Sequence, residues 1–228
     1  MDPRLVAAVQ NNACWCDIVC RSHGVPTVRS EQLWIAPEGS PPLYPDAVTL
    51  APQLAADSVL RRIDNGPGCS VKDSFADLDL SSHGFTVLLD AWWLFRGPAS
   101  PRTRPRLGWQ PITSEDDLKR WAVAADLEGI IRPELLRDRT VHVLAVRDGQ
   151  AVTTGAIINQ TGATIGISNV FTTVATPASA WRDLPAAVGD AIARVPIVGY
   201  EHGNALAAAA QSGFEPVAPL RVWLKPGA

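Results

Sequence analysis

Three side chains that can transfer protons stand next to one another near the end of the chain: Tyr200, Glu201 and His202. They stand at the end of a short apolar stretch, residues 196–200, that predicts a buried strand. Because α/β proteins bind ligands at the carboxyl ends of strands, a carboxylate or imidazole there can take a proton from a substrate. We predict a site at this strand end, with Glu201 or His202 as its base. A polar loop that only caps the following helix is the alternative.

Four cysteines and one histidine raise the question of a metal. On a helix, Cys16, Cys20 and His23 share one face, and Cys14 and Cys69 could complete a set of ligands. Structural zinc sites usually have two cysteines close together at a tight turn, as in C-x₂-C, and this chain lacks that spacing. Free cysteine is also among the most buried residue types. We predict that these thiols pack in the core without a metal; a metal-binding protein is the alternative.

The composition argues against several classes of protein. The 228 residues are 46% apolar and 19% charged, which is typical of a globular protein. The net charge is −3 and the basic cluster at 96–106 is diluted by prolines, which argues against nucleic-acid binding. No apolar run approaches the roughly 20 residues that cross a bilayer, and Asn11 and Asn12 interrupt the apolar core of any signal peptide. We therefore expect a cytoplasmic protein with no nucleic-acid or membrane partner.

Helical and extended patterns alternate along the first hundred residues. Apolar residues at helical spacing predict helices at 4–21, 54–63 and 75–80. Short apolar runs between turn residues predict strands at 32–36, 47–50 and 85–95. Glycine and proline then dominate residues 97–105, which indicates a linker.

The second half contains a strand meander followed by alternating helices and strands. A helix is expected after Thr113 or Ser114, and another from Pro185 through Val188 and Ile192. The remaining helix is expected at 204–211, and the strands at 109–112, 141–146, 151–158, 163–171, 196–200 and 214–224. This order predicts an α/β (α+β) fold with a mixed, mostly antiparallel sheet flanked by helices.

The last stretch carries a more specific pattern. An apolar strand ends in Tyr200 and Glu201, an alanine-rich helix follows at 204–210, and Gly213–Phe214 opens the final strand. This pattern and the order of elements from Trp109 to Leu224 resemble the GNAT N-acetyltransferases. The resemblance implies a GNAT-like sheet and transfer of an acyl group from acyl-CoA, with acetyl-CoA as the expected donor. The acceptor would be a small amine or a peptide amine, which attacks the thioester directly.

The resemblance also implies where acyl-CoA binds. In the family, backbone groups of the fourth strand hold the pantetheine arm, and a glycine-containing loop places the pyrophosphate at a helix N-terminus. The corresponding positions here are Val170, Phe171, Thr172, Thr173 and Val174, with Arg182 as a candidate phosphate partner. The loop 172–182 contains no glycine, which departs from the family pattern.

A second departure concerns the proton donor. Many GNAT members have a tyrosine four residues before the Gly-Phe glycine, where it protonates the departing thiolate; Ala209 stands at that position here. His202 stands where the family usually has an asparagine. Two functions therefore stay open. One is an acyltransferase that uses Glu201 or His202 beside Tyr200, and the other is a non-catalytic GNAT-like protein that binds a ligand or partner.

The first half of the chain repeats the order of sequence features found in the second half. In both, a short apolar strand containing threonine is followed by a helix, a Gly-Phe step and a strand with a tryptophan near its end. Such self-similarity suggests duplication. We predict an abbreviated N-terminal GNAT-like half at 1–98, a proline-rich linker at 99–106 and a C-terminal GNAT-like domain at 107–228.

Overall fold

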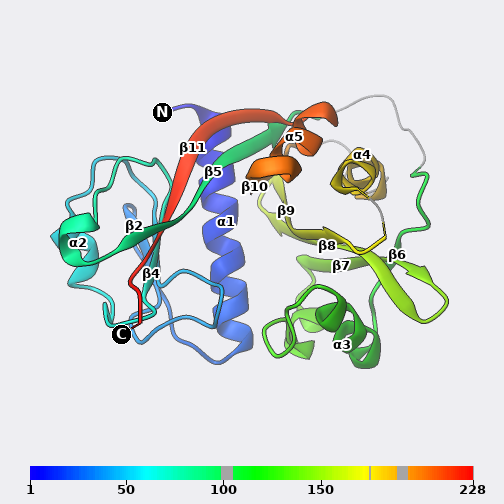
Figure 1. Ribbon diagram of the computed structural model, residues 1–228, viewed down its shortest axis with the longest axis horizontal. Coiled ribbons are helices and arrows are strands. Elements are labelled where there is room, and N and C mark those ends of the chain that lie inside the picture. Colours follow the sequence, from blue (N-terminus) through cyan, green and yellow to red (C-terminus); the bar gives the residue numbers. More distant parts are fainter. Residues whose placement is uncertain (99–104, 175, 189–194, 228) are drawn as a thin grey trace.

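One sheet runs through the whole molecule. In a computed structural model, which describes residues 1–98, 105–174, 176–188 and 195–227, the sheet has 11 strands in the order β1-β2-β3-β4-β11-β5-β10-β9-β8-β7-β6 (Figure 1). The strands are β1 (Val28–Arg29), β2 (Leu33–Ile35), β3 (Ala47–Thr49), β4 (Ser70–Asp73), β5 (Thr86–Arg96), β6 (Gln110–Pro111), β7 (Val141–Asp148), β8 (Ala151–Thr161), β9 (Thr164–Thr172), β10 (Ile197–Glu201) and β11 (Glu215–Leu224). The helices are α1 (Pro3–Ser22), α2 (Ala56–Leu60), α3 (Glu115–Ala124), α4 (Pro177–Ala187) and α5 (Gly203–Gln211), with 3₁₀ turns at Ser81–His83 and Pro133–Arg137.

Local capping explains why several elements begin and end where the sequence predicts. The Asp2 carboxylate accepts a hydrogen bond from the Arg4 backbone N–H at 2.9 Å, which caps α1. The Ser114 hydroxyl accepts one from the Asp117 N–H at 3.2 Å, which caps α3. Gly213, with a φ of 84°, follows α5 in the left-handed conformation that ends many helices. The predicted mixed α/β fold is confirmed.

The helix predicted from Pro185 is displaced. α4 begins at Pro177, and Pro185 lies inside it. Proline suits the first turn of a helix at either position, so its presence alone could not decide between them. Trp181 and Leu184 bury the apolar side of the earlier turns, which stabilises the helix ahead of the second proline. Ile192, predicted for the same helix, lies outside the described residues.

Residues 75–80 form no helix, contrary to the prediction. The Asp73 carboxylate accepts hydrogen bonds from the backbone N–H groups of Phe75 at 3.2 Å and Leu78 at 2.9 Å. Asp side chains that bind the following backbone in this way favour turns over helices. The helix predicted at 54–63 is shorter than expected, since α2 ends at Leu60.

The helices cover opposite faces of the sheet. Neighbouring residues of a strand face opposite sides, and Trp93 and Ile157 pack in the same core as α1. Leu94 and Ile158, the next residues along, pack in a second core with α4 and α5. Alternate residues of β2, β3 and β4 divide in the same way between α1 and α2. Figure 1 shows α1 crossing the middle of the molecule, with α2 and α4 towards opposite ends. In the part of the chain that the structure describes, no helix combines the length and apolar character needed to cross a bilayer.

The pairing of strands follows the same pattern from both ends of the sheet. β3 and β4 are parallel, as are β9 and β10, and antiparallel strands lie outside and between these pairs. β5 from the first half pairs with β10, whereas β11 from the second half pairs with β4. Each half therefore contributes its last strand to the other. This symmetry supports our proposal of duplicated halves at 1–98 and 107–228. Residues 99–104 of the predicted linker lie outside the described residues.

Gly166 lets α1 lie directly on the sheet. A Cβ atom at this position would overlap the side-chain oxygens of Asn11 in α1 and Asn159 in β8. We expect Gly166→Ala to lower the free energy of unfolding by about 1–3 kcal/mol, the usual cost of overpacking, as measured by urea denaturation. Gly108→Ala is the matched control, because no described atom outside its chain neighbours lies within 4 Å of its added Cβ. Equal stability of the two variants would contradict this account of the packing.

Candidate functional site

β9 and β10 separate soon after they meet. They pair only at Ile165 with Ile197 and at Gly166 with Val198. Beyond this point β10 stays paired with β5 and β9 stays paired with β8. The facing edges of β9 and β10 are therefore unpaired with each other across a widening gap, and backbone N–H and C=O groups left open in this way can bind an extended ligand.

β9 is irregular where the gap opens. Its register with β8 shifts, since Gly155 lies opposite Phe171 but Ile157 lies opposite Ser168. Two residues of β9 thus face one residue of β8, which is a β-bulge. Asn169, in the bulge, has a left-handed φ of 52°, which is uncommon for a residue other than glycine. Bulges of this kind reorient side chains and often lie beside active sites.

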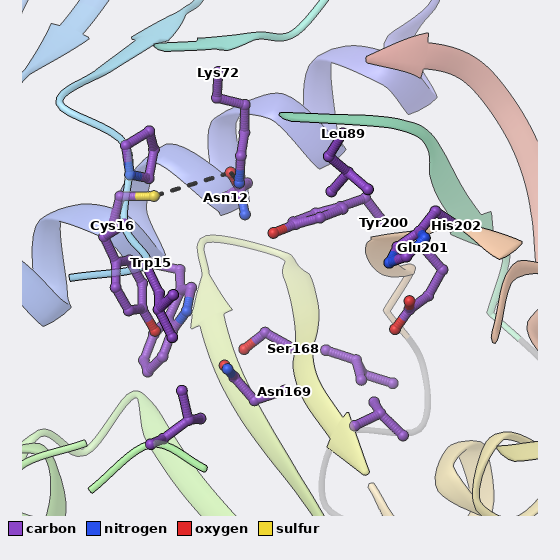
Figure 2. A pocket seen from close by; sticks show the side chains of 16 residues that line it. Asn12, Trp15, Cys16, Lys72, Leu89, Ser168, Asn169, Tyr200, Glu201 and His202 are labelled. Atoms are coloured by element: carbon purple, nitrogen blue, oxygen red, sulfur yellow. Dashed lines mark hydrogen bonds between the residues drawn. The ribbon is translucent and has the colours of Figure 1, made fainter. Parts of the chain in front are cut away.

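A cavity of about 280 Å³ lies between α1 and this gap. Its walls come from α1, the loop before β3, and strands β4, β5, β9 and β10. Figure 2 shows Lys72 and Asn12 on one side of the cavity and Ser168 and Asn169 on the other, with the ring of Tyr200 between them.

Residues from both faces of the sheet line the cavity. Tyr200 packs against the core on the α1 side, and Glu201, the next residue of β10, faces the opposite side because strand residues alternate. Both side chains nevertheless line the same cavity. Ile167 and Val170, which pack in the core with α4 and α5, line it as well.

The residues predicted as catalytic all lie at this cavity. Tyr200, Glu201 and His202 line it together, as does Val170 from the predicted cofactor-binding set. His202 is exposed and immediately precedes α5, and its side chain makes no capping hydrogen bond. The structure thus brings the three predicted proton-transferring residues to the mouth of the strand gap.

The other predicted cofactor-binding residues lie away from the cavity lining. The ring of Phe171 packs edge-on against Trp121 with centroids 5.3 Å apart. Thr172 accepts a hydrogen bond from the Thr154 hydroxyl at 3.2 Å. The Thr173 N–H donates to the Thr153 carbonyl at 2.8 Å. Val174 is 71% exposed in the loop before α4, and Arg182 is exposed in the second turn of that helix.

Burial changes the acid–base behaviour of Glu201. Loss of solvent raises the pKa of its carboxyl group from the ordinary value to about 7, and the backbone N–H of His202 opposes this rise only in part. A carboxylate with a pKa near neutrality is well suited to accept a proton from a substrate. Of the two bases that the sequence predicts, Glu201 thus has the environment for the role.

Tyr200 stands between an aromatic and a cationic group. Its ring meets Trp93 edge-on with centroids 5.7 Å apart, and Lys72 Nζ lies 4.2 Å from its centroid. Ala209, at the position where the resemblance implies a tyrosine, is fully buried on the inner side of α5. Of the phenols that line the cavity, Tyr200 comes from β10 and Tyr44 from the loop before β3, and neither comes from α5.

Sequence reasoning missed the residues that earlier segments bring to the cavity. Asn12 and Trp15 come from α1, Tyr44 from the loop before β3, and Lys72 from β4. Two signals were available. The paired asparagines interrupt the apolar spacing of the helix predicted at 4–21, and Lys72 directly follows the apolar Val71.

Three of the four cysteines are buried in separate cores, whereas Cys14 is only half-buried, so the prediction of core packing is wrong for Cys14. Cys16 and Cys20 are buried with α1, whereas Cys69 is buried in the core beneath α2. Burial raises the pKa of Cys16, which also lines the cavity, to about 11, so this thiol stays protonated at neutral pH. Over the described ranges of the chain, no cluster of three or more His, Cys, Asp or Glu side chains could hold a metal ion.

Comparison with known proteins gives a match at the level of structure. No protein-family model matches the sequence, and no curated protein matches it. A GCN5-related N-acetyltransferase from Kribbella flavida superposes with a TM-score of 0.65 at 14% identity, covering 97% of this chain and 96% of that one. A putative GNAT-family acetyltransferase from Novosphingobium aromaticivorans gives 0.59 at 16% identity, covering 96% and 99%.

A third structure, a conserved protein of unknown function from Staphylococcus epidermidis, gives a TM-score of 0.62 at 12% identity, covering 88% of this chain and 93% of that one. The likeness to the two acetyltransferases spans nearly the full length of each chain, so it includes the N-terminal half as well as the stretch from Trp109. The protein has the fold of the GCN5-related N-acetyltransferases.

Proposed function

We propose that the protein is an acyl-CoA-dependent N-acyltransferase, with acetyl-CoA as the donor and a small amine as the acceptor. The observation that supports this proposal best is the gap between β9 and β10, which opens into a cavity lined by the Glu201 carboxyl group. A gap between parallel strands offers free backbone groups to an extended pantetheine arm. The cavity beyond it offers a base beside the thioester.

The donor would lie along β9 and reach α4. The backbone of Ser168–Val170 is available at the gap, and the exposed residues Thr173, Val174 and Thr176 lead to the first turn of α4. The N–H groups of a first helical turn have no partners within the helix and attract phosphate. Pro177 removes only an N–H group that the helix itself does not use. A loop without glycine can therefore still present a helix N-terminus to the pyrophosphate.

The reaction then follows from the groups at the cavity. Glu201 takes a proton from the ammonium form of the acceptor, and the free amine attacks the thioester carbonyl. A C–N bond forms and the C–S bond breaks, and the CoA thiolate takes a proton from the Tyr200 phenol. The nitrogen of the new amide gives its extra proton to the resulting phenolate, and Glu201 releases the first proton to solvent after the products leave. Because the Cys16 thiol stays protonated, we assign no acyl-enzyme intermediate to it and propose direct transfer.

Ligand binding can be tested by thermal unfolding. Acetyl-CoA at one hundred times its dissociation constant should add about 2.7 kcal/mol to the free energy of unfolding, which for a chain of this size raises Tm by about 5–10 °C. ATP at the same concentration is the control for nonspecific effects of a polyanion. No shift with millimolar acetyl-CoA, propionyl-CoA or free CoA would exclude the proposal.

The absence of the family's tyrosine and loop glycine favours a second candidate, a GNAT-like protein that binds a ligand without catalysis. Thiol release from acetyl-CoA over a panel of amines distinguishes the two candidates. A thermal shift with acetyl-CoA but no thiol release above the buffer rate, with any amine, would support the non-catalytic protein.

A further inference from the structure

Lys72 is a buried cation at the wall of the cavity. Its side chain is only 4% exposed. The Nζ atom donates a hydrogen bond to Asn12 Oδ1 at 3.0 Å and lies 4.2 Å from the centroid of the Tyr200 ring. Within the described ranges of the chain, no carboxylate lies within ion-pair distance of this nitrogen. Lys72 thus contributes a positive charge to the cavity that the described protein does not neutralise.

The ammonium group of Lys72 has one N–H donor left without a partner among the described residues. An ammonium has three N–H donors; Asn12 accepts one, and the Tyr200 ring offers its negatively polarised face. Burying an ion without a counter-charge costs several kcal/mol. Glu201 does not supply that counter-charge, because burial raises the pKa of its carboxyl group whereas a close ammonium would lower it. A negatively charged ligand would supply the counter-charge to Lys72.

Other buried polar atoms at the same cavity also lack protein partners. Within the described residues, Tyr44 Oη, Ser168 Oγ and Asn169 Oδ1 make no hydrogen bond, and all three residues line the cavity. Buried polar atoms are nearly always hydrogen-bonded in folded proteins. Burial raises the pKa of Tyr44 well above its ordinary value, so its phenol remains a hydrogen-bond donor. The wall of the cavity thus carries polar as well as apolar side chains.

The position of Lys72 indicates which substrate carries the charge. Val71 packs in the core with α2 and Lys72, the next residue, contacts α1, so Lys72 lies on the α1 face of the sheet. The proposed donor site ends at α4, which covers the opposite face. Lys72 therefore lies on the side from which an acceptor would meet the thioester.

We propose that the acceptor is a small amine that bears a carboxylate, such as an amino acid, and that Lys72 binds this carboxylate. The inference rests on the proposed function and adds the substrate class. The cavity volume of about 280 Å³ is near the lower limit of small-molecule sites. That volume suits an acceptor of amino-acid size, bound by its carboxylate at Lys72 with its amine directed to the gap and Glu201.

The test compares amino acids with their carboxamides in a thiol-release assay with acetyl-CoA. The wild-type protein should prefer the acid of each pair, and Lys72→Met should reduce the ratio of kcat/KM between acid and amide by about 10–100-fold, as the loss of one charged hydrogen bond predicts. The ratio is the readout, since it does not depend on how much active protein each preparation contains. Lys119→Met, on the exposed side of α3, is the matched control and should keep the wild-type ratio.

A binding experiment separates failure of this inference from failure of the proposed function. N-acetylalanine should raise the Tm of the wild type more than N-acetylalaninamide does, and this difference should vanish in Lys72→Met and in the second variant Lys72→Gln. That result together with no turnover would reject the acyltransferase but keep the carboxylate site. Turnover with an acid-to-amide ratio that Lys72→Met leaves unchanged would reject the carboxylate site alone.

Two further substrates test the source of the charge. O-phosphoethanolamine presents a phosphate in place of the carboxylate, and succinyl-CoA presents a carboxylate on the donor. If the effect of Lys72→Met appears with either of these and not with amino acids, the proposed acceptor class is wrong.

Discussion

Glu201→Gln should abolish most of the proposed acyltransferase activity. Glutamine keeps the size and hydrogen-bonding capacity of the side chain but cannot accept a proton, and general-base catalysis typically contributes 10²–10⁴-fold to a rate. We expect kcat/KM for the best amine acceptor to fall by roughly 10²–10⁴-fold at pH 8, measured by thiol release. His202→Ala is the comparison, because the exposed imidazole is the other predicted base. A full loss in His202→Ala and none in Glu201→Gln would reverse the assignment.

The pH dependence provides an independent check on the same group. Glu201 must be ionised to act as a base, so wild-type kcat/KM should rise with pH and level off above its pKa of about 7. The Glu201→Gln variant should lose this inflection in its residual rate. A wild-type profile without an inflection between pH 6 and 8 would show that another group accepts the proton.

Glu201 should also make the folded protein less stable at high pH. The pKa of its carboxyl group rises from 4.5 to about 7 on folding, so the folded state favours the protonated form. The stabilising effect is present below pH 4.5 and is lost as pH rises through 7. Each pKa unit corresponds to about 1.4 kcal/mol, and partial exposure reduces the effect to about 2 kcal/mol. Glu201→Gln should therefore unfold at a higher Tm than the wild type at pH 8, with little difference at pH 5.

Asp183→Ala should cause the second large loss, this time in stability. The Asp183 side chain is 6% exposed and accepts hydrogen bonds from the backbone N–H groups of Arg106 and Leu107, both at 2.7 Å, and from Trp109 Nε1 at 3.1 Å. Hydrogen bonds to a charged acceptor contribute about 1.5–3 kcal/mol each, and some rearrangement of the segment before β6 will offset the loss. We expect the free energy of unfolding to fall by about 3 kcal/mol in urea denaturation.

The same carboxylate holds α4 against the segment that precedes β6. Since the proposed pyrophosphate site is the first turn of α4, Asp183→Ala should also raise the KM for acetyl-CoA. Arg182→Ala is the neighbouring control; its exposed side chain should change stability by no more than about 0.5 kcal/mol. Asp183→Asn keeps one acceptor oxygen and should lie between the wild type and Asp183→Ala. Equal stability of Asp183→Ala and Arg182→Ala would rule out this anchoring role.

Local patterns in the sequence predict most of the elements and the position of one side of the site. The caps Asp2 and Ser114 and the glycine after α5 act within a few residues, so they can be read without knowledge of the fold. The same holds for Tyr200, Glu201 and His202, which lie at a strand end by virtue of their place after an apolar run. At α4 the prediction failed because a tertiary contact overrides the local signal, since buried Trp181 and Leu184 lie before the expected start. At 75–80 it failed because the local hydrogen bonds of Asp73 favour a turn.

Only the tertiary structure brings the other side of the site into place. Lys72 and Asn12 are far from Tyr200 in sequence and reach it because β5 and β11 each pair across the two halves of the sheet. Strand order and register depend on contacts between distant residues, which the local spacing of apolar residues does not encode. The raised pKa of Glu201 has the same origin, since it results from burial by neighbouring elements and not from any adjacent residue. The sequence alone thus determined the class of the fold and the strand end that carries Tyr200, Glu201 and His202, and only the tertiary packing decided which other side chains line the cavity.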